Sequence, residues 1–304
     1  MQPIPNITKL SDNVIRILGQ NSGLMTLQGT NSYLIGKRQK RLLLDTSDPN
    51  KKEYLDLLEN VLKDEKVIIS DLILTHFHQD HIGALKEIKA RKLISDDCRV
   101  WKFPKTDVME DFKELDLLQL TDEQTFTTEE GDVFKIIYTP GHTTDHVILH
   151  DTQKNVIFSG DCILGEGTAV FEDLYDYMKS LDKILRLKPK KIFPAHGNVI
   201  DNAIEKIEYY IAHRQERERQ IMSAFDIANR LTLMGIVEIV YKETPKNLWN
   251  AAAINVHHHL TKLQKEGKIS EIHEDDEVLW EKIHNNKLPL RTTKMLLIIK
   301  NRRP

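Results

Sequence analysis

Three histidines and one aspartate fall within a nine-residue run, THFHQDHIG at 75–83, and give the chain its clearest potential for chemistry. Imidazole nitrogen is the most common metal ligand in proteins, and carboxylate oxygen is a frequent partner. The apolar residues just before the run predict a buried strand. Side chains two apart in an extended segment point the same way, so His76 and His78 are expected to bind one ion together. Asp80 and His81 follow the bend, within reach of a second ion.

Three further candidates each follow another strand-like run, beside a glycine or proline that sharpens the turn. They are His142 in TPGHT, Asp161 in FSGD and His196 in FPAHG. The complete set has seven members: His76, His78, Asp80, His81, His142, Asp161 and His196. Seven ligands are too many for one tetrahedral zinc, and they suit two ions that share a bridging carboxylate.

Alternating and helical hydrophobic patterns predict the elements that must position these residues. Strands are expected at 14–18, 31–35, 42–44, 72–74, 133–138, 147–150, 156–159 and 192–193, and helices at 50–63, 81–92, 174–187 and 203–219. The cluster 45–49 is expected to cap the helix at 50–63. The polar stretch 104–130 predicts loops and short strands. Strands interleaved with helices indicate an α/β fold in which helices cover the sheets.

The composition changes after about residue 220. Three helices are expected at 221–230, 237–241 and 250–265, followed by a hairpin that ends near residue 280. This arrangement is typical of a winged-helix module. We therefore predict a catalytic domain at 1–220, a winged-helix-like domain at 221–284 and a tail at 285–304, which is either disordered or a late strand.

Composition describes an ordinary globular protein, with 40% hydrophobic and 29% charged residues. The net charge of −3 provides no general attraction for nucleic acid, so any nucleic-acid binding would depend on local patches. Cys98 and Cys162 are too few for a disulfide framework and favour a reducing compartment. No apolar run is long enough to span a membrane, and the N-terminus has no clear secretory or mitochondrial signal. These features alone favour the cytoplasm, and no obligate protein partner is evident.

The ligand set, in this order along the chain, resembles the metallo-beta-lactamase superfamily. Segments 26–33, 160–168, 171–178 and 260–269 are similar to an animal branch of that family, and the resemblance extends over roughly residues 8–280. It implies a four-layer αββα sandwich with a C-terminal winged-helix-like domain and two zinc ions. It also implies an endoribonuclease that cleaves single-stranded RNA in the mitochondrial matrix. One zinc would bind His76, His78 and His142, the other Asp80, His81 and His196, and Asp161 would bridge them.

Zinc-bound hydroxide would then cleave the phosphodiester, with Asp80 orienting it, and leave 5′-phosphate and 3′-hydroxyl ends. His146 is either the general acid or a residue that orients a ligand. Tyr175 and Tyr177 either stack on RNA bases or pack inside the protein. The basic residues at 188–191 and at Arg214, Arg217 and Arg219 either contact phosphates or form solvated faces.

Further residues and functions have alternative interpretations. Cys162 is expected to be a core thiol, and His257–His259 to be surface and core of the winged helix, because consecutive helical residues diverge. The main alternative function is a thioester hydrolase of the glyoxalase II type, which uses the same seven-ligand set. Beta-lactamase activity, or a non-catalytic RNA-binding scaffold that has lost ligands, fits the sequence less well.

Overall fold

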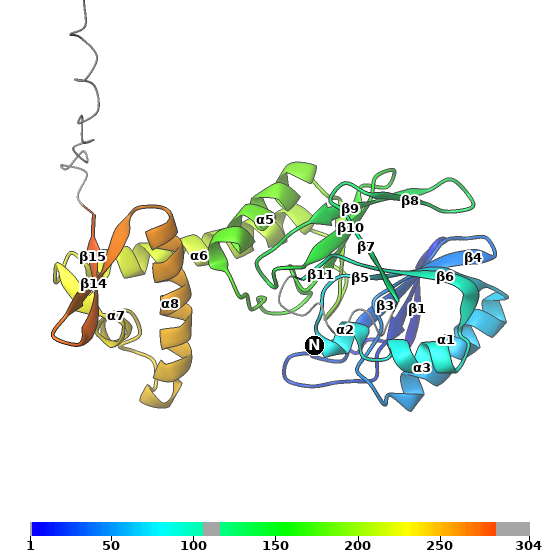
Figure 1. Cartoon of the computed structure of the whole chain (residues 1–304), viewed down its shortest axis with the longest axis horizontal. Helices are drawn as coiled ribbons and strands as arrows, with labels where there is room; N and C mark the ends of the chain where they lie inside the picture. The colour runs from blue at the N-terminus through cyan, green and yellow to red at the C-terminus, as the bar shows by residue number, and fades with distance from the viewer. Residues whose placement is uncertain (1, 106–115, 284–304) are drawn as a thin grey trace, which may run out of the picture. The chain divides into compact units, whose positions relative to one another are not determined.

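The computed structural model describes residues 2–105 and 116–283 of the chain (Figure 1). The first of two compact units ends at Arg217, and the second begins at Glu218. Helix α6, Ala203–Ala224, starts in the first unit and ends in the second. In the described part of the chain, no helix combines the length and hydropathy that crossing a bilayer requires. The predicted tail at 285–304 lies outside the described residues.

Seven strands form the first sheet, and they lie side by side in the order of the sequence. They are β1 (Ile7–Ser11), β2 (Val14–Leu18), β3 (Asn31–Ile35), β4 (Lys40–Leu44), β5 (Ile68–Leu74), β6 (Ile94–Lys102) and β7 (Leu117–Gln119). Pairing is antiparallel from β1 to β4 and parallel from β4 to β7. The predicted strands in this region are confirmed. Strand β6 was not predicted, because its first half is polar and largely exposed and so does not alternate.

Five strands form the second sheet, in the order β12-β11-β10-β9-β8. They are β8 (Thr125–Thr127), β9 (Val133–Tyr138), β10 (Val147–Asp151), β11 (Val156–Gly160) and β12 (Lys191–Pro194). Only the β11–β12 pair is parallel. Helix α5, Leu174–Leu187, has the bounds that the sequence predicted.

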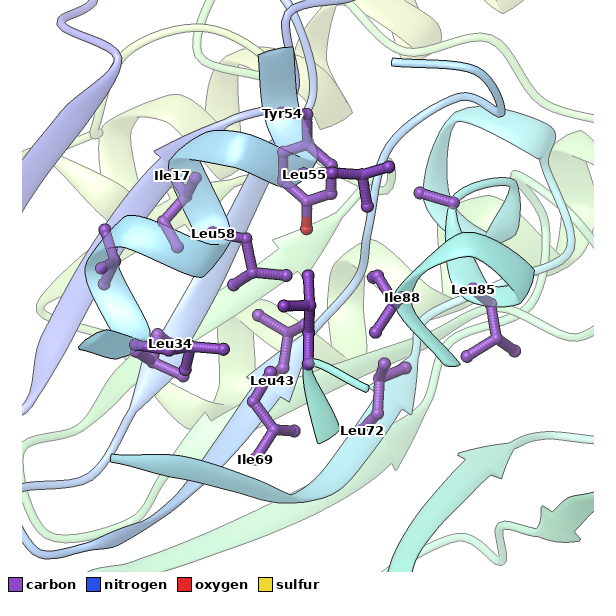
Figure 2. Packing of buried hydrophobic residues seen from close by; sticks show 14 of the residues in the cluster. Ile17, Leu34, Leu43, Tyr54, Leu55, Leu58, Ile69, Leu72, Leu85 and Ile88 are labelled. Atoms are coloured by element: carbon purple, nitrogen blue, oxygen red, sulfur yellow. The ribbon is translucent and has the colours of Figure 1, made fainter. Parts of the chain in front are cut away.

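Buried residues form three layers of core in the first unit. On β2, Ile15 and Ile17 face one layer and Val14 faces another, because successive side chains of a strand alternate. The first layer lies between the first sheet and helices α1 (Lys52–Glu65) and α3 (Leu85–Ala90), and Figure 2 shows its side chains. The second layer lies between the two sheets, and the third packs the second sheet against α5 and α6. This is the predicted four-layer αββα sandwich.

The helix predicted at 81–92 is wrong, because two short helices replace it. Helix α2 spans Gln79–Ile82, and α3 starts at Leu85. Between them Gly83 lies against Pro49, where a Cβ atom would come within 2.4 Å of the proline Cδ, and Ala84 N–H donates to Ser47 O at 2.8 Å. The break therefore follows from contacts with the loop after β4, which a periodic pattern does not reveal.

The predicted cap of the helix at 50–63 is also wrong. Lys51 is the N-cap residue of α1, and its side chain makes no capping hydrogen bond. Asp45, from the cluster that was expected to cap, instead accepts hydrogen bonds from Thr75 N–H at 2.7 Å and Thr75 Oγ1 at 2.9 Å. This aspartate therefore supports the histidine run rather than the helix.

The second unit has helices α7 (Leu233–Val240) and α8 (Trp249–Lys265) and a sheet in the order β13-β15-β14. Its strands are β13 (Arg230–Thr232), β14 (Ile269–Glu274) and β15 (Glu277–Lys282). This is a winged-helix arrangement, as predicted. The separate helix expected at 221–230 is wrong, because α6 continues to Ala224 and Arg230 starts a strand that pairs with Glu281.

We expect Leu58→Ala to lower the free energy of unfolding of the first unit by about 2–5 kcal/mol, because Leu58 is fully buried on the inner face of α1 and its loss leaves a cavity. Urea unfolding followed by circular dichroism measures this change. Lys52→Ala on the same helix is the matched control, since Lys52 only pairs with Asp56 at the surface. Equal midpoints for the two variants would contradict the assigned core.

Candidate metal centre

The histidine run leaves the centre of the first sheet and turns at once into a helix. Strand β5 ends at Leu74, His76 is fully buried, and His78 is the extended N-cap residue of α2. Asp80 and His81 therefore lie in the first turn of α2. All four residues follow the end of β5, as predicted, and they therefore lie at one end of the sandwich.

The other three candidates leave the second sheet, after β9, β11 and β12 respectively. Gly141 allows the loop of His142 to approach α5 closely. Its φ angle is +131°, and a Cβ atom there would lie 2.3 Å from Tyr177 Cα, so no larger residue fits. Gly165 is similarly tight, because a Cβ atom would come within 2.3 Å of Asn198 O and separate the loops that follow Asp161 and His196.

One group of ligand atoms contains His76, His78, His142 and Asp161. His142 Nε2 lies 3.2 Å from His76 Nε2 and 3.1 Å from His78 Nδ1. The two nitrogens of His76 and His78 are 2.9 Å apart. Asp161 Oδ2 completes the group, 3.5 Å from His142 Nε2.

The second group contains Asp80, His81 and His196. Asp80 Oδ2 lies 3.1 Å from His81 Nε2 and 3.2 Å from His196 Nε2. The other oxygen of Asp161, Oδ1, faces this group at 3.1 Å from His196 Nε2 and 3.5 Å from His81 Nε2. A single carboxylate thus offers one oxygen to each group, which is the geometry of a bridging ligand.

The donor atoms fit metal ions of the size of zinc. Bonds of ~2.0–2.1 Å at tetrahedral angles separate neighbouring ligand atoms by roughly 3.3–3.4 Å, close to the spacings in both groups. Within the described part of the chain, the buried atoms His81 Nε2 and Asp161 Oδ1 have no hydrogen-bond partner. Such atoms are costly unless a cation or proton satisfies them. The grouping agrees with the predicted ligand set, while the identity and number of the ions stay predictions.

Hydrogen bonds behind the ligands fix the orientation of their rings. His81 Nδ1 lies 3.0 Å from Asp45 Oδ2, His142 Nδ1 lies 2.8 Å from Val170 O, and His76 Nδ1 lies 3.0 Å from Thr75 Oγ1. With Nδ1–H donated to the oxygens of Asp45 and Val170, the Nε2 lone pairs of His81 and His142 point into the site. Thr30 Oγ1 donates to Asp80 Oδ2 at 3.0 Å and holds that carboxylate in place.

The two halves of the site differ in their protonation. Burial lowers the pKa of His76 and His142, and it lowers the pKa of His78 to about 4, so the first group presents neutral nitrogens. Burial also disfavours a charged His196, but Asp161 outweighs it and raises the pKa of His196 to about 9. Burial alone would raise the pKa of Asp161, yet His196 and His81 lower it well below its usual range.

Several predicted residues have packing roles. Tyr177 is fully buried and its hydroxyl donates to Cys162 O at 2.6 Å, so its predicted role in stacking on a base is wrong. Arg214 is buried, donates to Ala169 O at 2.8 Å, and does not form part of a basic surface. Cys162 lies in the core as expected. Tyr175 is half-buried beside Lys179, and its contact with substrate stays a prediction.

His146 orients a ligand and is not placed to act as the general acid. Its Nε2 accepts a hydrogen bond from Asp161 N–H at 3.1 Å, and its Nδ1 lies 2.9 Å from Thr139 Oγ1. Both ring nitrogens are therefore engaged, and the side chain is fully buried. This arrangement favours the second of the two roles weighed from the sequence.

Sequence reasoning missed four supporting residues. Asp45 and Thr30 hold His81 and Asp80, and the buried pair of Lys102 and Asp145 ties the loop of His142 to β6. Asp45 follows the strand at 42–44, so the strand-exit rule applied to that strand would have found it. Lys102 and Asp145 lie far apart in sequence and give no local signal.

We expect zinc binding at pH 7 to release protons, because His196, with its pKa raised to about 9, is protonated in the metal-free site. Below pH 9 each displaced proton weakens the apparent zinc affinity about tenfold per unit decrease in pH. Calorimetry in buffers of different ionisation enthalpy measures the number released. Zinc binding to His196→Gln should release fewer protons. In the wild type, binding heats that do not depend on the buffer would show that zinc binding releases no protons and would refute the prediction.

Each of the two units matches a known protein family. A model of the metallo-beta-lactamase superfamily matches residues 25–196, and one of the beta-lactamase associated winged helix domain matches residues 232–280. The beta-lactamase-like protein 2 homolog of Drosophila melanogaster is 54% identical over 275 residues, which cover 88% of this chain and 94% of that protein.

A more distant relative is the atrochrysone carboxyl ACP thioesterase of Aspergillus fumigatus, 35% identical over 228 residues that cover 75% of this chain and 69% of that protein. A beta-lactamase domain protein from Burkholderia ambifaria has the same fold, with a TM-score of 0.73 at 15% identity over 93% of this chain and 96% of that one. As its ligand run predicted, the chain belongs to the metallo-beta-lactamase superfamily.

Proposed function

We propose that this hydrolase is an endoribonuclease that cleaves single-stranded RNA with two zinc ions. The observation that supports a two-ion site is the placement of Asp161, whose Oδ2 faces the His76 group and whose Oδ1 faces the His81 group. A winged helix, a fold common among nucleic-acid-binding proteins, accompanies this site and favours RNA. Location in the mitochondrial matrix, rather than the cytoplasm, stays a prediction.

Two bound zinc ions would supply an activated water near neutral pH and neutralise the charge that builds on a phosphodiester. The protein's contribution is to hold the ligands still. Thr30 fixes Oδ2 of Asp80 and so sets the direction of the carboxylate that we assign to orient the attacking water. Because this attack leaves the 2′-hydroxyl of RNA unused, the products are a 5′-phosphate and a 3′-hydroxyl.

Charges on the second unit suggest which part of it meets RNA. The turn between β14 and β15 has four consecutive carboxylates, Glu274-Asp275-Asp276-Glu277, and would repel a phosphate backbone. Lys246 instead lies over the ring of Trp249, 5.3 Å from its centroid, at the start of α8. A cation beside an aromatic ring suits a stacked base and its phosphate. We therefore assign RNA contact to this end of α8 and exclude the hairpin turn.

A thioester hydrolase of the glyoxalase II type is the second candidate function. The observation that favours it is the similarity to fungal proteins named as ACP thioesterases, at 34–35% identity over about three quarters of this chain. The same buried ligand groups suit attack on a thioester carbonyl, because the developing charge again lies on an oxygen. Specificity must therefore come from residues outside the ligand set.

We expect zinc-loaded protein to cleave a single-stranded RNA oligomer and to leave an acyl thioester of glutathione or of an acyl carrier largely intact. The reason is that the second unit provides a nucleic-acid-binding fold. Gel analysis of end-labelled RNA and thiol release measured with a chromogenic reagent, both at matched enzyme concentrations, give the comparison. Turnover of a thioester without RNA cleavage would contradict the endoribonuclease proposal and support the thioester hydrolase.

Asp80→Ala and His142→Ala are each expected to reduce hydrolysis by more than about 100-fold, because losing even a group that only orients a ligand costs roughly 10–100-fold. RNA binding, measured by fluorescence anisotropy, should survive in both. His273→Ala is the matched control, since this histidine is largely exposed and pairs with Glu271 in the hairpin. If either ligand variant keeps full turnover, the reaction takes place elsewhere.

A further inference from the structure

Arg16 is a buried guanidinium for which the described residues provide no counter-charge. It lies on β2 with 3% of its surface exposed, on the side of the strand that faces the second sheet. Within the described part of the chain its only hydrogen bond runs from Nη2 to Thr8 Oγ1, 3.0 Å away. Its Nε is buried and has no hydrogen-bond partner among the described residues, and no carboxylate contributes to the shift of its pKa.

This arrangement is energetically unusual. A buried charge that lacks a partner costs several kcal/mol, so buried arginines are normally paired with a carboxylate or another anion. Burial lowers the pKa of Arg16, yet a guanidinium remains charged at neutral pH. The side chain therefore has a positive charge and, among the described residues, an Nε–H without an acceptor, and both features favour an external anion.

A cavity of about 450 Å³ is available beside this side chain. Leu10 and Val199 form its apolar wall and belong to the layer between the sheets. Gln2, Glu166 and Asn198 are its polar lining residues, and Asn198 Nδ2 donates to Gln2 O at 3.4 Å. The volume is within the range of ~300–1,000 Å³ that is typical of small-molecule sites, and it exceeds what one phosphate group fills.

The chain that forms this cavity is well anchored. Gln28 accepts a hydrogen bond from Ile4 N–H at 2.8 Å and donates to Gln2 O at 2.9 Å, which holds the N-terminal segment in place. On the other side, Gly165 N–H donates to His196 O at 2.8 Å. The cavity thus adjoins the loops that follow Asp161 and His196, although its lining includes none of the seven ligands.

We propose that the cavity at Arg16 binds the phosphate group of a phosphorylated ligand, separately from the metal centre. The guanidinium pairs with two phosphate oxygens, as this planar fork does in other proteins, and the amide of Asn198 or Gln2 donates to a third. Glu166 accepts from a hydroxyl of the same ligand, which favours a phosphorylated sugar or nucleotide over a bare anion. The source is either the 5′-phosphate end of an RNA or a free phosphorylated metabolite.

Titration calorimetry with inorganic phosphate and adenosine 5′-monophosphate tests this proposal on the full-length, zinc-loaded protein. Arg16→Met keeps the apolar stem and removes the charge, and it should weaken one binding event by at least about tenfold. His142→Ala controls for phosphate bound at the metal centre, and it should retain the Arg16-dependent event. Identical isotherms for the wild type and Arg16→Met would overturn the proposal.

Two further variants keep the test decisive if Arg16→Met does not fold. Arg16→Lys keeps the charge but loses two-point pairing and should weaken binding, whereas Glu166→Gln removes a like charge and should strengthen binding of inorganic phosphate. Unchanged affinity in both would overturn the proposal. A cleavage assay distinguishes the two sources of the phosphate. If the ligand is the end of an RNA, KM is lower for 5′-phosphorylated than for 5′-hydroxyl RNA, and this difference is lost in Arg16→Lys. Equal KM values together with Arg16-dependent phosphate binding identify a free ligand.

Discussion

The buried carboxylate of Asp161 lies between two groups of imidazoles, and the rest of the first unit is arranged around it. Its two oxygens face nitrogens of His142 on one side and His196 on the other. In an environment of low dielectric constant, lone pairs that converge this closely need positive charge between them. That electrostatic demand explains why the family uses the site to hold metal ions.

Such a site requires loops from two separate sheets to meet with little freedom. Asn31, on the first sheet, donates to Pro194 O and Gly197 O at 2.9 Å each, and Tyr33 donates to Pro194 O at 2.6 Å. These bonds attach the loop of His196 to the first sheet. The close approach of Gly141 to Tyr177 fixes the loop of His142 in a similar way. Rigid loops keep the ligands in a reactive geometry.

The ligand groups alone do not select a substrate, since they suit attack on a phosphodiester as well as on a thioester. Specificity must depend on features that the ligand set does not include. The winged-helix unit, with its acidic turn, is one such feature. Arg16, which has no counter-charge among the described residues, is another, because it places a positive charge beside the loops of Asp161 and His196.

Sequence alone determined the family and the sandwich of sheets and helices, and it predicted a candidate ligand set whose members the fold brings together. Short-range patterns were sufficient for this, because strand periodicity and the residues at strand exits are local properties. Where contacts distant in sequence override local preference, the same patterns failed. Pro49 and Ser47 divide the helix expected at 81–92, and pairing with β15 makes Arg230 part of a strand rather than of a helix.

Only the tertiary structure decided which side chains serve the site and which support the core. Tyr177 and Arg214 have the residue types of RNA-contacting side chains, yet both are buried. Asp45 and Lys102 have no motif, yet they hold the ligand loops. The physical reason is that burial and pairing are set by the packing of distant segments. Sequence spacing therefore predicted the candidate ligands of this hydrolase, and the folded chain decided their partners, their protonation and the neighbouring cavity.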